Sequence, residues 1–193
     1  LLADHVILAV SAQIAARLLR SLIPEASACL STISYSSTAT VTLAYKSQDI
    51  EHALDATGFI VPRHEGLHMT ACSWSSSKWV GRTSHPYSLF RCFFGGHGNN
   101  RDLISNNQAL RQLACRELSK VMGIRGTPIR GWIHRWPKIM PQYTLGHQEK
   151  INTIEALIQP QSGIHLAGSS FRGVGVSNCI HQATLVAKRI TAK

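Results

Sequence analysis

The sequence lacks any run of about 18 consecutive apolar residues, so it offers no transmembrane helix. It also lacks a Cys-x-x-Cys pair, which excludes zinc-ribbon and thioredoxin-type proteins. Its 14 glycines and 7 prolines are too few for a collagen-like or low-complexity chain. The remaining composition is globular, because 44% of the 193 residues are hydrophobic, which is enough for the core of one or two domains.

Clustered cysteines are absent as well. The thiols are five in number, an odd count, and they lie far apart at Cys29, Cys72, Cys92, Cys115 and Cys179. This pattern is typical of reduced cysteines. We therefore expect a cytoplasmic protein without disulfides.

Acidic residues are scarce, with 10 Asp and Glu against 20 Lys and Arg, and the net charge is +10. Residues 101–150 carry nine basic and three acidic side chains, so +6 of the excess lies there. The basic residues are interspersed and never form a run. Such a surface suits nucleic acid, acidic lipid or a polycarboxylated substrate, and it equally suits plain solvation.

The first residues are unusual, because the chain begins with Leu1 and has neither an initiator Met nor the features of a signal peptide. The apolar run Val6–Val10 is typical of a buried strand. We therefore expect that the chain is cut from a longer one.

The hydrophobic pattern predicts an α/β (α+β) chain in which a middle domain is inserted between two pieces of another domain. Ser11 is expected to cap a helix, Gly123 to end one, and Pro137 and Pro141 to bracket a loop. The expected strands cover residues 6–10, 34–46, 58–62, 67–74, 88–95, 129–136 and 163–168. The expected helices cover residues 11–19, 100–121 and 147–157, with two more beginning at Pro24 and Gly173.

His64–His68 spells H-E-x-x-H, the zinc-binding motif of metalloproteases. That chemistry needs a helix, which brings both histidines to one face. Here Pro62 precedes the motif and Gly66 interrupts it, so we expect a hairpin turn and no metal site.

The segment from Ile164 to Ile180 reads as a strand, a glycine turn, a loop and a glycine-rich start of a helix. Glycines let the backbone approach a ligand closely, and free N–H groups at the helix start favour negative charge. A reduced flavin carries such charge near N1 and O2. A junction shaped only by packing would look the same, so the glycines alone leave both interpretations open.

Three stretches, Gly58–Pro62 (G-F-I-V-P), Pro141–His147 (P-Q-Y-T-L-G-H) and Leu166–Ile180, together resemble the C-terminal part of the oxygen-dependent porphyrinogen oxidases. These FAD enzymes are protoporphyrinogen oxidase and coproporphyrinogen III oxidase. The resemblance runs through nearly the whole chain, and Thr70–Trp79 looks most like the bacterial coproporphyrinogen branch.

The resemblance implies the C-terminal part of a flavin amine-oxidase-type fold, in which an antiparallel or mixed substrate-domain sheet with helices is inserted between pieces of an FAD-binding domain. Residues 1–35 and 130–193 would belong to the FAD-binding domain, and residues 36–129 to the substrate-binding domain. It further implies oxidation of a porphyrinogen to the porphyrin of haem biosynthesis, by hydride transfer to flavin N5. Dioxygen would be the acceptor and would yield hydrogen peroxide.

The same resemblance carries a flavin-contacting role to six residues, Gly168, Ser169, Gly173, Val174, Gly175 and Val176, and names no catalytic residue. Arg172 and the Ser177–Asn178 pair depart from the family's usual residues, so no role is inferred for Arg172. The substrate's propionates call for a basic residue. Arg63, Arg91 and Arg135 are candidates, and the sequence does not choose among them.

The G-x-G-x-x-G fingerprint that binds the FAD pyrophosphate is missing from this sequence. It would come from an absent N-terminal half, in the same chain or in a partner chain, and we expect no oxidase activity without it. The alternatives are another flavin amine oxidase or desaturase, and a non-catalytic porphyrin-binding remnant. Nucleic-acid binding is the least favoured, and peripheral contact with a membrane stays open.

Overall fold

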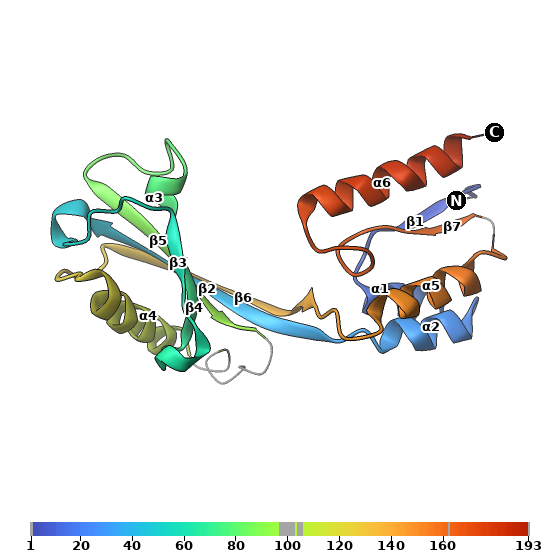
Figure 1. The fold of residues 1–193 in the computed structure, drawn as a ribbon, viewed down its shortest axis with the longest axis horizontal. Coiled ribbons are helices and arrows are strands. Elements are labelled where there is room, and N and C mark those ends of the chain that lie inside the picture. Colours follow the sequence, from blue (N-terminus) through green and yellow to red (C-terminus); the bar gives the residue numbers. More distant parts are fainter. Residues whose placement is uncertain (1, 97–102, 104–105, 162, 193) are drawn as a thin grey trace. The chain divides into compact units, whose positions relative to one another are not determined.

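A computed structural model describes residues 2–96, 103, 106–161 and 163–192. The chain forms two compact units (Figure 1). Unit 1 combines Leu1–Tyr35 with Pro141–Lys193, and unit 2 is Ser36–Met140. Among the described helices, none has the length and apolarity needed to cross a membrane.

Unit 1 is built on a parallel pair of short strands, β1 (Val6–Leu8) and β7 (Ile164–Leu166). Its helices are α1 (Ala12–Leu19), α2 (Pro24–Ser31), α5 (His147–Ile158) and α6 (Val176–Thr191). Figure 1 shows the strand pair between α6 on one side and α1, α2 and α5 on the other. The apolar faces of α1, α2 and α5 share one buried cluster, so these helices supply most of the core of unit 1.

Unit 2 is a five-stranded antiparallel sheet in the order β3-β4-β5-β2-β6. Its strands are β2 (Tyr35–Lys46), β3 (Gly58–Ile60), β4 (Met69–Trp74), β5 (Tyr87–Gly95) and β6 (Arg130–Pro141). Helix α4 (Asn107–Met122) contributes to the same core as alternate residues of β2, β4 and β5. The short helices η1 (Ser47–Asp49), η2 (Arg63–Glu65) and α3 (Ser75–Lys78) lie in connections.

Most of the predicted elements are confirmed in kind and place. Ser11 caps α1 by accepting from Ile14 N, and Gly123 ends α4 in the left-handed conformation at φ 61°. The turn predicted across H-E-x-x-H is confirmed, because η2 joins the paired strands β3 and β4. The long helix begins at Asn107 where 100 was predicted, and residues 100–102, 104 and 105 lie outside the described residues.

The loop predicted between Pro137 and Pro141 is wrong, because β6 runs on to Pro141. Strand β6 lies at the edge of the sheet, where a proline costs no ladder hydrogen bond. Lys138 adopts a positive φ of 47°, and its N–H donates to Ser37 Oγ at 2.9 Å. Residues 130–140 therefore lie in the sheet of unit 2, although the resemblance grouped them with residues 141–193.

The chain leaves unit 1 and returns to it at neighbouring points. Gln142 N donates to Ser34 O at 2.9 Å. Ser34 lies one residue before Tyr35, and Gln142 lies one residue after Pro141. Both ends of the inserted segment are thus held together inside unit 1. Which unit binds FAD and which binds substrate stays a prediction.

A buried carboxylate fixes the start of β4. Glu117 on α4 is only 6% exposed, and its two oxygens accept from His68 N and Met69 N, each at 2.8 Å. The pairing of β4 with β5 is irregular at this point, because the register shifts between Met69 and Ala71. The carboxylate therefore supplies acceptors at the irregular start of this strand.

Replacing Glu117 by Ala is expected to lower the free energy of unfolding by about 2 to 4 kcal/mol, because two buried amides lose their acceptor. Glu117→Gln keeps one acceptor oxygen and should cost less. Urea unfolding followed by circular dichroism measures both. Gln112→Ala, at an exposed position of the same helix, should change stability by less than about 0.5 kcal/mol, and an equal loss in both alanine variants would contradict this role for Glu117.

Candidate functional site

The loop between β7 and α6 has a conformation that needs glycine at both ends. Gly168 and Gly173 each have a φ of 129°, which side-chain-bearing residues rarely adopt. A Cβ on Gly173 would also collide with the side chain of Asn178. Between the two glycines, Ser170 and Phe171 are 2% and 1% exposed, so the loop is anchored from within.

Helix α6 begins directly after this loop, and no side chain caps its first turn. Gly175 occupies the N-cap position, and beyond its chain neighbours the nearest atom to a Cβ added there would be Ser177 Oγ at 3.8 Å. Val174 and Val176 beside it are exposed. Uncapped amides at an open helix start suit a negatively charged or strongly polar ligand group.

A tyrosine hydroxyl joins the two ends of the loop. Tyr143 Oη donates to Ser169 O at 2.8 Å and accepts from Gly173 N at 2.7 Å. Desolvation by burial, which outweighs the bond from Gly173, raises the pKa of Tyr143 and keeps the donor proton in place. A second hydroxyl chain holds the middle of the loop: Tyr35 Oη accepts from Ala12 N at 2.8 Å and lies 2.6 Å from Ser170 Oγ.

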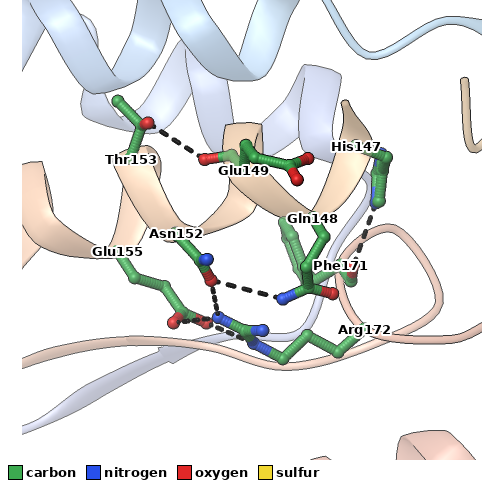
Figure 2. A network of polar contacts seen from close by, with 8 residues as sticks. All are labelled: His147, Gln148, Glu149, Asn152, Thr153, Glu155, Phe171 and Arg172. Carbon is green, nitrogen blue, oxygen red and sulfur yellow. Dashed lines mark hydrogen bonds and ion pairs between the residues drawn. The ribbon is translucent and has the colours of Figure 1, made fainter. Parts of the chain in front are cut away.

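Two further side chains connect the loop to helix α5: His147 of the helix and Arg172 of the loop (Figure 2). His147 is 7% exposed, and its Nε2 lies 2.9 Å from Phe171 O, so it donates to that carbonyl. Arg172 reaches both oxygens of Glu155, at 3.0 and 2.6 Å, and Asn152 Oδ1 at 2.9 Å. The hydrogen bonds to Glu155 raise the pKa of Arg172. Arg172 therefore points toward α5 and fastens the loop.

The six predicted cofactor residues, which are close in the sequence, lie in the loop and at the start of α6: Gly168, Ser169, Gly173, Val174, Gly175 and Val176. Their contact with a flavin stays a prediction. Sequence reasoning missed the residues that shape the loop, Tyr143 and His147, although both lie in the P-Q-Y-x-x-G-H stretch that it singled out.

Unit 2 carries a groove of about 600 Å³ on the sheet face opposite α4. Alternate residues of three strands line it, and two tryptophans and three arginines are among them. They are Thr40, Thr42, Ala44, Leu89, Arg91, Arg130, Trp132, His134 and Trp136, together with Arg82, Thr83, Tyr87 and Ile129. No acidic residue belongs to this lining in the described part of the chain. The groove is thus aromatic, open and positively charged.

Of the three arginines considered for propionate binding, only Arg91 lines this groove. Arg135 lies on the other face of β6, where its Nε donates to Leu103 O at 3.0 Å. Arg63 lies in η2 and is exposed away from the groove. Arg82 and Arg130 were missed. Only the strand order brings Arg130 of β6 to the same face as Arg91, and Arg82 reaches the groove from the connection between α3 and β5.

Within the described residues there is no group of three or more His, Cys, Asp or Glu side chains able to hold a metal ion. The two candidate regions present backbone amides, hydroxyls, arginines and aromatic rings.

Comparison with known proteins identifies the family of this chain. The family model described as "Flavin containing amine oxidoreductase" matches residues 1–191. The chain belongs to this family. The name of the family implies that its cofactor is a flavin.

Relatives of this flavin oxidoreductase chain include the coproporphyrinogen III oxidases of Staphylococcus aureus and Bacillus subtilis. The Staphylococcus aureus protein is 35% identical, and the alignment covers 84% of this chain and 35% of the relative. The Bacillus subtilis protein is 32% identical, and the alignment covers 93% of this chain and 38% of the relative. A solved structure from Exiguobacterium sp. 255-15, provisionally named a protoporphyrinogen oxidase, is similar at TM-score 0.81 and 30% identity, covering 97% of this chain and 41% of that one. The chain thus spans about two fifths of the length of the proteins it matches.

Replacing Gly173 by Ala is expected to lower the free energy of unfolding by about 1 to 3 kcal/mol, because the new side chain meets both an unfavourable φ and Asn178. Gly175→Ala is the matched control. Its φ of −69° suits any residue and its surroundings are open, so it should change stability by less than about 1 kcal/mol. Chemical denaturation of both variants tests this, and equal stabilities would show that the loop is not constrained as described.

Proposed function

We propose that this chain is the C-terminal part of a flavoenzyme that oxidises a porphyrinogen, coproporphyrinogen III or protoporphyrinogen IX, to the porphyrin. FAD is the proposed cofactor and dioxygen the proposed acceptor, with hydrogen peroxide as second product. The fingerprint-bearing N-terminal half, from the same polypeptide or from a partner chain, completes the FAD site in this proposal. The relatives' names and the two-fifths coverage support it.

The groove of unit 2 is the observation that carries the choice of substrate. A porphyrinogen is a wide apolar macrocycle with carboxylates on its rim. Trp132 and Trp136 offer apolar surface to the macrocycle, and both are about half exposed in this chain. Arg82, Arg91 and Arg130 offer charge-assisted hydrogen bonds to carboxylates, with no acidic neighbour among the described lining residues to compete for them.

The loop and the start of α6 are the proposed flavin contact. A flavin held there would supply the hydride-accepting chemistry of the proposed oxidation, with dioxygen as the final acceptor of the electrons. Gly175 leaves room for a close approach, and the uncapped amides of the first turn of α6 can donate to flavin oxygen or nitrogen atoms that gain charge. In this proposal the chain's own part is to bind and orient the flavin and the substrate.

The deciding experiment mixes the native, flavin-loaded protein with coproporphyrinogen III in air. Porphyrin fluorescence should rise, and peroxide should form in step with it. Protoporphyrinogen IX and a simple amine are tested in parallel. Bleaching of the flavin by the amine alone would favour the alternative amine oxidase, and porphyrin binding without turnover would favour a non-catalytic remnant.

Arg91→Gln is expected to raise KM for the porphyrinogen about tenfold with little change in kcat, because one charged hydrogen bond to the substrate is lost. Arg63→Gln removes the same charge from an exposed position outside the groove and is the matched control. Steady-state kinetics at constant ionic strength separates the two. Equal effects in both variants would show that net charge matters and the groove does not.

A further inference from the structure

The stretch Pro141–His147 stands out in the sequence, but the proposed oxidation gives it no part. It lies between β6 and α5, and two of its side chains contact the loop that precedes α6. We propose that Tyr143 and His147 are positioning residues that set the shape of the flavin-contacting segment and thereby the properties of the bound flavin. This inference rests on the proposed function.

The Tyr143 hydroxyl is placed to define the span of the loop. It donates to Ser169 O at 2.8 Å and accepts from Gly173 N at 2.7 Å, so one oxygen ties together residues four positions apart. Gly173 has a positive φ of 129°, and helix α6 begins three residues later at Val176. A change in the loop's span would therefore shift the amides at the start of α6.

His147 fixes both the tyrosine ring and the loop. Its ring stacks on Tyr143 with centroids 3.8 Å apart and planes 15° apart. Its Nε2 donates to Phe171 O, which lies midway between the two residues that Tyr143 bridges (Figure 2). Gly146, at φ 77°, lets the chain turn so that α5 starts with this histidine. Tyr143, Gly146 and His147 together therefore determine how this stretch contacts the loop before α6.

The inner and outer sides of the segment differ in a way that fits a positioning role. Ser170 and Phe171 face inward and are buried, whereas Val174 and Val176 are 52% and 78% exposed. His147 bonds to the buried inner side of the segment at Phe171 O, whereas Tyr143 is 41% exposed and bonds to the segment at Ser169 and Gly173. Both residues act on the backbone of the segment, so each can affect the flavin through the loop.

The test compares Tyr143→Phe with the unaltered protein, both in native, flavin-loaded form. The variant removes one oxygen and keeps the ring that stacks on His147. We expect a shifted flavin absorption spectrum, a lower flavin midpoint potential and a kcat reduced about tenfold or more, because the amides near the flavin lose their alignment. The KM for the porphyrinogen should stay within about twofold.

Tyr45→Phe is the matched control, because Tyr45 is fully buried in the core of unit 2 and removing its hydroxyl leaves the loop untouched. It should keep the spectrum, potential and kcat of the unaltered protein. Wild-type spectrum, potential and kcat in Tyr143→Phe, with only a loss of stability, would overturn the inference. If Tyr143→Phe fails to fold, His147→Gln is measured instead, and unchanged flavin properties there would overturn it as well.

Failure of the proposed function looks different. In that case the unaltered, flavin-loaded protein forms no porphyrin from either porphyrinogen. Failure of the present inference requires an unaltered protein that works and a Tyr143→Phe variant that works equally well.

Discussion

Strands β1 and β7 lie side by side although nearly the whole chain separates them, and unit 1 depends on this parallel pairing. Each strand has only three residues, so the ladder alone cannot hold them. The helices supply the rest, because α1, α2 and α5 pack their apolar faces into one cluster with Leu8 and Phe171. Phe171 belongs both to this cluster and to the loop before α6. The conformation of the candidate flavin site is therefore tied to the core that joins the two ends of the chain.

The element pattern was largely predictable, because local signals and burial agree. Ser11, Pro24 and Gly123 mark helix boundaries, and period-two alternation in β2 places Val41, Leu43 and Tyr45 in the core. Residues 137–141 were not predictable in this way. Two prolines signal a loop when only neighbouring residues are considered, and only the strand order shows that β6 lies at an edge that tolerates them.

The candidate site likewise combines features that local sequence predicts with features that depend on the tertiary structure. Glycine spacing and the resemblance pointed to residues 168–176, and in the structure this segment links the end of β7 to the start of α6. The groove needed tertiary pairing, since Arg91, Arg130 and Trp132 come from strands that meet only in the folded sheet. Arg135 shows why residue type alone does not identify the groove. It alternates with the groove-lining residues of β6, so its side chain points to the sheet face that α4 covers. The partners of Tyr143 likewise lie 26 and 30 residues away, beyond the reach of local patterns.

The bond between Ser34 O and Gln142 N brings the two ends of the inserted segment next to each other within unit 1. A segment whose ends meet in this way can be exchanged for another without stretching the surrounding chain. Unit 2 is therefore an exchangeable segment, and grafting the sheet of another protein of this family in place of residues 36–140 would leave Tyr35 and the α1, α2 and α5 core intact. Evolution could diversify substrate recognition in this segment while the loop beside α6 kept its geometry, and a protein engineer could use the same junction.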